Sequence, residues 1–185
     1  MGMVTEMHLR PAGESTGRFN YRGKHRYLIT LLCRPSSGPI AKKEHVEGTL
    51  RLLHSCSRSH LFELYAYCFL PDRLVLLIRG MDDTSDMKAF LSDFRASSSA
   101  AFRGAHGTEL WMRKYQERVL RKTELTRAAA EEIFHLPVKA GLASTPGAYP
   151  FQGSHVLPSL SRVPHPSRAR KTTRYGKGRP PFRAR

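Results

Sequence analysis

Two strand-like runs, LFELYAYCFL (61–70) and RLVLLI (73–78), stand close together in the sequence with only Pro71 and Asp72 between them. The first run is rich in aromatic residues. The second is apolar at nearly every position, which is typical of a strand buried on both faces. Proline and aspartate are common turn residues, so the pair favours a tight connection. The segment therefore predicts a β-hairpin whose second strand is largely buried.

Upstream of the hairpin, the sequence predicts one strand and one helix. HRYLITLLC (25–33) is apolar and contains the aromatic and β-branched residues of a buried strand. Residues 41–57 then place Val46, Leu50 and Leu53 on one face of a helix, because these residues recur at a spacing of four and three. A strand followed by a helix is thus expected before the hairpin.

Downstream of the hairpin, a second helix is expected to start near three aspartates, because carboxylates suit the positive end of a helix dipole. These are Asp82, Asp83 and Asp86. The core face of this helix is predicted to consist of Met87, Phe90, Leu91, Phe94 and Ala101.

The next segment predicts a further strand and a third helix. ELWMRKYQERVLR (109–121) alternates roughly between apolar and basic residues, with Leu110, Met112 and Val119 as its apolar members. Thr123 is predicted to cap the helix, and Pro137 to end it, because proline disfavours helix at the residue before it. The apolar stripe of the helix is Leu125, Ala129, Ile133 and Leu136.

This order of elements predicts an α+β protein with a ferredoxin-like βαββαβ antiparallel sheet, helices on one face, and an additional C-terminal helix. We expect a flexible lead-in over residues 1–22, one domain over residues 23–152, and a disordered basic tail over residues 153–185. The tail is rich in Pro, Ser, Gly, Lys and Arg, and its apolar content is too low to offset the entropy of ordering.

The net charge of +16 predicts a polyanionic partner, most often a nucleic acid. The last acidic residue is Glu132, and ten Lys and Arg residues follow it. Tyr175 and Phe182 stand among the cations of the tail, where they could stack on unpaired bases. Alternatively, the tail is a solvated segment that raises only non-specific affinity. Its predicted phosphate contacts are Arg168, Arg170, Lys171 and Arg174.

Three cysteines, Cys33, Cys56 and Cys68, lie in apolar surroundings at no metal-like spacing and are expected to be buried, reduced thiols. The N-terminus lacks the pattern of a secretory signal, and no run of residues is apolar enough to span a membrane. We therefore expect a cytoplasmic, nucleoid-associated protein that has no membrane partner.

Two segments, YAYCFLPDRLVLLIRG (65–80) and residues 110–151, together carry a family resemblance. The second segment contains PVKAGL (137–142) and AYPF (148–151). In order and separation they resemble the REP-associated tyrosine transposases, a branch of the HUH single-strand transposases. The resemblance covers roughly residues 23–153. It implies single-stranded or hairpin DNA as substrate, a divalent metal such as Mg²⁺ held by two histidines, and a nucleophilic tyrosine on the last helix.

The three catalytic positions that the resemblance implies are all occupied by other residue types. The histidine pair falls on Arg73 and Val75, and the tyrosine falls on Glu132. Arginine has no lone pair to donate and valine has no donor atom, so neither can replace a histidine as ligand. The sequence therefore predicts a degenerate active site without a metal cofactor.

Several alternatives to this interpretation stay open from the sequence. Tyr115 could serve as a displaced nucleophile, and Asp72 and His135 could take part in a rebuilt metal site. Arg73 and Glu132 could form an ion pair across the former active site, or each could point separately to solvent or DNA.

The function expected from the sequence is DNA binding with cleavage and strand transfer lost. The alternatives are an active transposase with displaced catalytic groups, and a basic RNA-binding protein. The DNA sequence recognised and the choice between monomer and dimer stay open. The predicted contacts in the domain are Arg22, Lys24, Arg26, Arg113, Lys114, Arg118, Arg121, Lys122 and Lys139.

Overall fold

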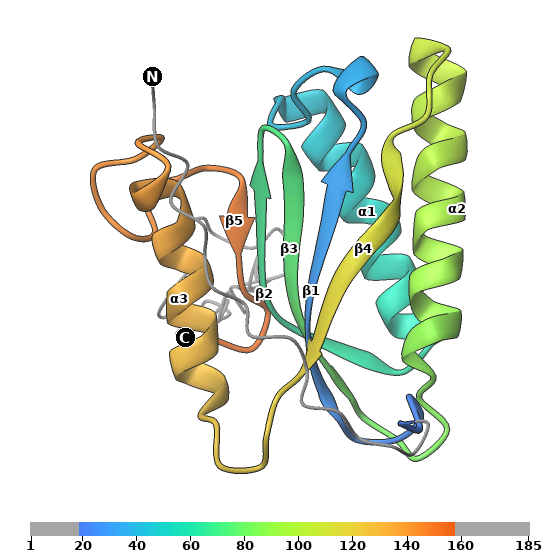
Figure 1. Ribbon diagram of the computed structural model, residues 1–185, viewed down its shortest axis with the longest axis vertical. Helices are drawn as coiled ribbons and strands as arrows, with labels where there is room; N and C mark the ends of the chain where they lie inside the picture. The colour runs from blue at the N-terminus through green and yellow to red at the C-terminus, as the bar shows by residue number, and fades with distance from the viewer. Residues whose placement is uncertain (1–18, 158–185) are drawn as a thin grey trace, which may run out of the picture.

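The structure, a computed structural model, describes residues 19–157. One five-stranded sheet has the order β4-β1-β3-β2-β5, and every pair of neighbours is antiparallel (Figure 1). Its first four strands have the ferredoxin-like order, as predicted. The strands are β1 (Arg26–Cys33), β2 (Phe62–Leu70), β3 (Arg73–Gly80), β4 (Trp111–Val119) and β5 (Gln152–Gly153).

Three α-helices cover the sheet from both sides. α1 (Lys43–Ser59) and α2 (Met87–His106) pack together on one face. α3 (Thr126–Lys139) packs mainly over β2 and β3 on the opposite face (Figure 1). The two helices of the βαββαβ unit therefore share one face, as predicted, and the additional C-terminal helix covers the other. We refer to the two sides as the α1/α2 face and the α3 face.

The predicted hairpin is β2 and β3, joined at Pro71 and Asp72. β3 is central, and its alternate residues are buried on opposite faces because side chains alternate along a strand. Leu76 belongs to the core beneath α1 and α2, whereas Val75 and Leu77 belong to the core beneath α3. Burial on both faces explains the continuous apolar run of this strand.

The α1/α2 face contains the larger core, and α2 contributes much of it. Asp86 is the N-cap of α2 and accepts hydrogen bonds from the amides of Lys88 and Ala89. Phe90 and Phe94 are fully buried, as predicted. The prediction for Ala101 was wrong, because this residue is exposed and Phe102, the next residue of the helix, points into the core instead.

The third helix differs from its predicted form at both ends. It begins at Thr126, so Thr123 is not its cap, and Leu125 is 73% exposed instead of lying on the apolar stripe. Pro137 lies inside the helix, which continues to Lys139. Because proline has no N–H, the helix lacks the hydrogen bond that residue 137 would otherwise donate to the carbonyl of Ile133, but it continues for two more residues.

The strand β5 was not predicted, because two residues are too short to show a pattern. Gln152 pairs with Cys68, and Gly153 pairs with Tyr67. A side chain at position 153 would place a Cβ 2.6 Å from the hydroxyl oxygen of Tyr67, so any other residue there would force the tyrosine ring to move. β5 covers part of the outer edge of β2.

All three cysteines are free thiols. Cys33 and Cys68 are buried as expected, but Cys56 is only half-buried. Among the residues that the structure describes, no helix has the length and apolar character needed to cross a bilayer.

Candidate nucleic-acid interface

The positions that the resemblance assigns to metal ligands lie on the α3 face of β3. Arg73 and Val75 are two residues apart on this strand, so both side chains project from the same face. Their partners on β1 are Leu32 and Thr30. The sheet therefore places positions 73 and 75 on one face, as a pair of metal ligands would require. Whether they can bind a metal depends on the side chains present.

Arg73 is engaged by its neighbour in the sequence. Its Nε donates to Asp72 Oδ1 at 3.0 Å, and its Nη2 donates to Asp72 Oδ2 at 2.7 Å. These hydrogen bonds hold the pKa of the Asp72 carboxyl below its usual value. The guanidinium thus satisfies a carboxylate that could otherwise have been offered to a metal ion.

Val75 is 2% exposed and lies between Thr30 of β1 and Cys68 of β2. Its methyl groups belong to the core beneath α3. Burial raises the pKa of the Cys68 thiol to about 12, so this sulfur stays protonated at neutral pH. A protonated thiol is a poor metal ligand. The centre of β3 is therefore apolar and without an ionised donor.

Glu132 lies on α3 beside the buried residues Ile133 and Phe134, and is itself exposed. The ion pair between Arg73 and Glu132, one of the two arrangements left open by the sequence, does not form within the described residues. Within residues 19–157, the acidic partner of Arg73 is Asp72, and Glu132 has no ion pair. The adjacent carboxylate of Asp72 reaches the guanidinium without bridging from helix to sheet, whereas Glu132 projects into solvent.

Tyr115 lies on the other face of the sheet. It pairs with Leu31 of the α1/α2 core, and its hydroxyl accepts a hydrogen bond of 2.9 Å from Lys88 Nζ on α2. Lys88 also donates to Glu117 at 2.6 Å. The sheet therefore separates Tyr115 from Arg73 and Val75, and this tyrosine cannot take the place of the family nucleophile at that site.

The remaining candidate ligands do not form a metal site. His135 lies exposed on α3, where its Nδ1 is 2.7 Å from the backbone oxygen of Glu131. Within residues 19–157, no three His, Cys, Asp or Glu side chains gather as a cation site. The donor set on the α3 face, a valine, a protonated thiol and an arginine-bound carboxylate, does not fit the divalent metal of the family.

Four of the cations predicted to bind DNA are engaged within the protein. Arg22 pairs with Asp86 at 3.0 Å, and Lys24 lies 3.9 Å from Asp83. Arg118 pairs with Glu124 in the loop after β4. In Arg26, Nη1 donates to the backbone oxygen of Glu124 and to Thr126 Oγ1, both at 2.7 Å. Arg26 thereby connects β1 to the start of α3.

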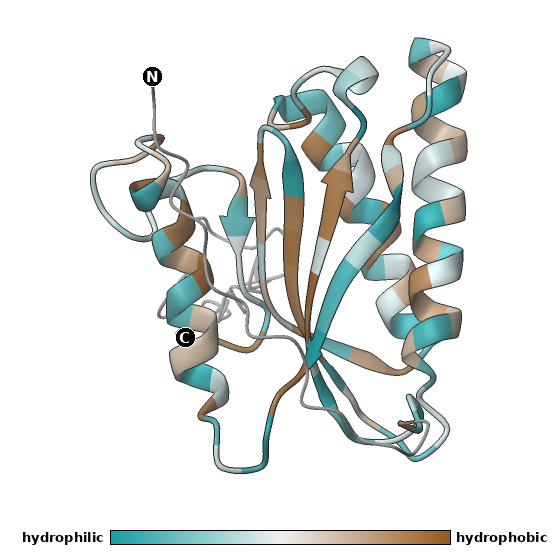
Figure 2. Ribbon diagram, in the orientation of Figure 1, coloured by the Kyte–Doolittle hydropathy of each residue, from teal (hydrophilic) through white to brown (hydrophobic). Residues whose placement is uncertain are grey.

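Five other predicted cations are exposed, and their side chains form no salt bridge within residues 19–157. They follow β4, the loop after it and the end of α3, and they are Arg113, Lys114, Arg121, Lys122 and Lys139. β4 is an edge strand and is mostly hydrophilic, whereas β1 is mostly apolar (Figure 2). Arg168, Arg170, Lys171 and Arg174 lie outside the described residues.

The alternation of side chains along β4 places its cations on two different faces of the sheet. Lys88 of α2 contacts both Tyr115 and Glu117, so these two residues face α2. Alternation then places Lys114 and Arg118 on the α3 face. α3 packs mainly over β2 and β3, so these two cations lie on the half of the face that the helix does not cover.

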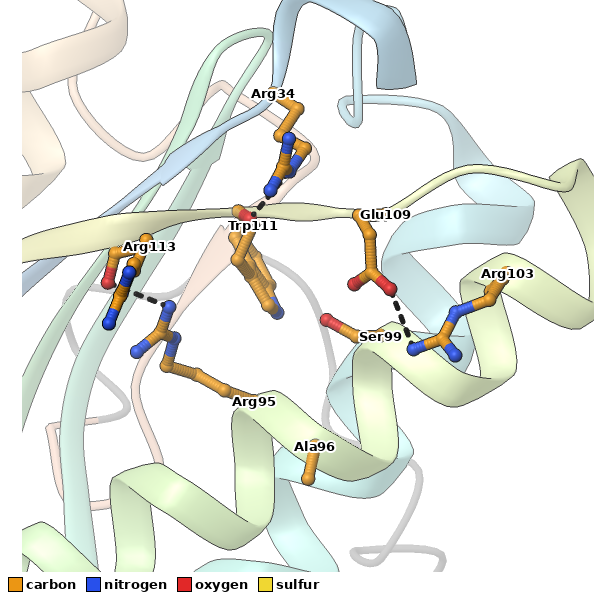
Figure 3. A pocket seen from close by; sticks show the side chains of 8 residues that line it. All are labelled: Arg34, Arg95, Ala96, Ser99, Arg103, Glu109, Trp111 and Arg113. Atoms are coloured by element: carbon orange, nitrogen blue, oxygen red, sulfur yellow. Dashed lines mark hydrogen bonds and ion pairs between the residues drawn. The ribbon is translucent and has the colours of Figure 1, made fainter.

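One group of cations was missed by the sequence analysis. Arg34, Arg95 and Arg103 join Arg113 around a pocket on the α1/α2 side of β4 (Figure 3). They come from the residue after β1, from α2 and from β4, and their spacing in the sequence has no pattern. Only the folded chain brings them together.

No protein-family model matches the sequence, and no curated protein matches it significantly. A structure of a REP-associated tyrosine transposase bound to a REP hairpin is similar, with a TM-score of 0.64 and 19% identity. That alignment covers 80% of this chain and 87% of the other. A protein of Deinococcus radiodurans R1 described as a transposase aligns over 64% of this chain and 94% of its own, with 20% identity and a TM-score of 0.46. The chain thus has the α+β fold of the REP-associated tyrosine transposase.

Proposed function

We propose that this protein binds DNA, as a relative of the REP-associated tyrosine transposases, and that the DNA is single-stranded or folded as a hairpin. The observation that carries the proposal is the set of five exposed cations that form no salt bridge within the described residues, along β4, its following loop and the end of α3. The transposase of similar fold is itself bound to a REP hairpin. A protein with this ligand would associate with the nucleoid.

The proposed interface is the half of the α3 face, along β4, that α3 itself does not cover. Lys114 lies on this face of β4, and Arg121 and Lys122 follow in the loop that leads to α3. Because β4 is an edge strand, a ligand can approach these cations from the side. Phosphate contacts of this kind give affinity and orientation, whereas sequence preference needs contacts to the bases.

We further propose that this DNA-binding protein does not cleave DNA by the metal and tyrosine chemistry of the family. Support comes from the chemistry of the aligned positions. Val75 has no donor atom, Arg73 is held by Asp72, and Glu132 stands where the resemblance expects a tyrosine. The family metal has no fitting donor set on the α3 face.

Fluorescence anisotropy of a labelled DNA hairpin with single-stranded flanks tests the binding. If about six phosphates are neutralised, log affinity should fall with log salt at a slope of roughly −5 for a duplex, and somewhat less for single strands. The triple variant K114Q/R121Q/K122Q should weaken binding by about tenfold or more and reduce the slope by about three. A salt-independent affinity would refute the proposal.

A matched control removes the same charge from the other side of the molecule. Lys43, Arg51 and Arg58 are exposed on α1, and none has an acidic partner within the described part of the chain. The variant K43Q/R51Q/R58Q should bind the hairpin within about twofold of the wild type. Equal losses in both triple variants would show that net charge alone governs the affinity.

Nicking of the same hairpin in the presence of Mg²⁺ or Mn²⁺ tests the loss of cleavage. We expect no nicked product and no covalent protein–DNA product. A covalent product that disappears in the Tyr115→Phe variant would show that the protein is an active transposase with a displaced nucleophile. Tighter binding of an RNA hairpin of the same sequence would favour the RNA-binding alternative.

A further inference from the structure

The pairing of β4 with β1 is interrupted by a bulge near the start of β4. Tyr115 lies opposite Leu31, but the next registered pair is Trp111 with Cys33. Four residues of β4 therefore span the length of two residues of β1. Such bulges redirect side chains and are frequent beside functional sites.

Two arginines from other elements hold the backbone of this bulge. Arg95 Nη2 on α2 donates to the carbonyl oxygens of Met112 at 2.7 Å and Arg113 at 3.1 Å. Arg34 Nε, just after β1, donates to the carbonyl oxygen of Trp111 at 3.3 Å. These bonds fix each guanidinium by one side and leave its other N–H groups available.

Together with the bulge, these arginines line a pocket of about 370 Å³ (Figure 3). Four arginines surround it, and the acidic side chain among the lining residues is Glu109, which pairs with Arg103 at 2.7 Å. The lining therefore has a large excess of positive charge. Figure 3 shows the guanidinium groups of Arg95 and Arg113 side by side.

The pocket contains donors that the protein itself does not satisfy. Arg95 Nε is buried and has no hydrogen-bond partner. The guanidinium of Arg113 has no acidic partner within residues 19–157. Bringing like charges together and leaving a buried donor unpaired both destabilise the folded protein. An anion in the pocket would offset both costs, because it would accept from these donors and separate the charges.

We propose that this pocket, which we call the bulge pocket, binds a backbone phosphate of the DNA. The inference rests on the proposed DNA-binding function and adds a second contact surface to it. Guanidinium groups match phosphate oxygens in bidentate geometry, which favours phosphate over a neutral ligand. A stacked base does not fit, because Trp111 is 4% exposed and its indole N–H is already bonded to Ser98 Oγ at 2.8 Å.

The location of the bulge pocket sets the path of the DNA. Arg113 lines the pocket on the α1/α2 side of β4, whereas Lys114 lies on the α3 face of the same strand. A strand of DNA that contacts both must cross the edge of the sheet at β4. Cations on an edge strand also discourage pairing with other strands. Protection of the edge does not explain the cluster, because Arg34 and Arg95 lie outside β4 and would not be needed for it.

The test compares two double variants of the full chain. R34Q/R113Q removes two cations of the bulge pocket, and R51Q/R58Q removes two exposed cations of α1. With the labelled hairpin and its flanks, R34Q/R113Q should weaken binding about tenfold and reduce the salt slope by about two. The control should stay within about twofold of the wild type. R113Q alone should retain the fold, because the Arg113 side chain makes no hydrogen bond or ion pair within residues 19–157.

A second readout uses inorganic tripolyphosphate in place of DNA. This anion should raise the melting temperature of the wild type and of R51Q/R58Q, and should raise that of R113Q much less. If R113Q responds to tripolyphosphate like the wild type, the bulge pocket is not an anion site and the inference is overturned.

The two readouts separate the failure of this inference from the failure of the proposed function. If the wild type does not bind the hairpin, DNA binding is refuted. If tripolyphosphate nevertheless stabilises the wild type and not R113Q, the bulge pocket is still an anion site. Conversely, if changing Lys114 weakens hairpin binding but changing Arg34 and Arg113 does not, the proposed function holds and the bulge pocket is refuted as a DNA contact.

Discussion

The two faces of the sheet are covered in different ways. On the α1/α2 face, two helices pack over the strands, and Phe90 and Phe94 are fully buried between helix and sheet. On the α3 face, one helix packs mainly over β2 and β3, and the strand β4 presents Lys114 and Arg118 instead of apolar residues. The first face therefore contains the larger buried core, and the second presents more charged residues on β4.

The largest expected effect tests the core of the α1/α2 face. Phe94 is fully buried and packs against Phe90 and Trp111. Phe94→Ala should lower the free energy of unfolding by about 3–5 kcal/mol, measured by urea denaturation and circular dichroism. Ala101→Ser, at an exposed position of the same helix, should change it by less than about 0.5 kcal/mol. Equal effects would mean that the assigned core side of α2 is wrong.

A smaller loss is expected on the α3 face when Arg26 is changed. Its guanidinium holds the loop after β4 and the start of α3, so Arg26→Gln should cost about 1.5–3 kcal/mol. Amide hydrogen exchange should accelerate in the first turn of α3. Arg79→Gln is the control, because Arg79 on the same face makes one long hydrogen bond of 3.4 Å to Tyr65. Weaker DNA binding with unchanged exchange would instead make Arg26 a DNA contact.

The buried hydrogen bond between Trp111 Nε1 and Ser98 Oγ predicts a comparable or smaller effect on the α1/α2 face. Ser98→Ala leaves the indole N–H buried and unpaired, which should cost about 1–3 kcal/mol in urea unfolding. Ser99→Ala, at the next position of α2 and only half-buried, should cost less. If the two variants are equally stable, the hydrogen bond contributes nothing measurable.

The smallest effect concerns the pair of Asp72 and Arg73 on the α3 face. Because the Arg73 hydrogen bond lowers the pKa of Asp72 from its usual 3.8, the carboxylate stabilises the fold above that pH. The contribution is lost as the pH falls through the lower pKa of the folded state. Asp72→Asn should therefore cost less than about 1 kcal/mol at pH 6, because the pair is largely exposed.

The pH dependence supplies the check for this pair. The difference in urea midpoint between wild type and Asp72→Asn should shrink as the pH falls below 3.8. Glu132→Gln should have a smaller effect at pH 6, because Glu132 has no ion pair within residues 19–157. A larger cost for Glu132→Gln would revive the Arg73–Glu132 ion pair.

Local patterns predicted the parts of the fold that local interactions determine. The apolar run of β3 reflects burial on both faces, and Val46 and Leu53 lie buried on α1 as their spacing indicates. Asp86 caps α2 near the position that its acidic cluster suggested. By contrast, Leu125 and Ala101 are apolar by type but exposed, because the packing of a whole helix decides which of its residues are covered.

The candidate site could be predicted from the sequence only where the residue type alone decides whether a side chain can bind a metal. The absence of histidine at positions 73 and 75 is visible in the sequence. The roles of Arg26 and the bulge pocket are not, because they depend on residues far apart in the chain. Arg26, for example, bonds the carbonyl of Arg121, 95 residues later. The sequence shows which residues are cations, but it does not show which of them already form ion pairs or hydrogen bonds within the protein.

The short strand β5 has a consequence for any attempt to trim the chain. Its pairing with Tyr67 and Cys68, together with the hydrogen bond from the Phe69 amide to the Phe151 carbonyl, occupies backbone groups along the outer edge of β2. A protein shortened before Tyr149 would still pair this aromatic strand with β3 but would leave its outer edge without a partner. Open strand edges recruit strands from other copies. The two residues of β5 would thus protect the molecule from edge-to-edge aggregation.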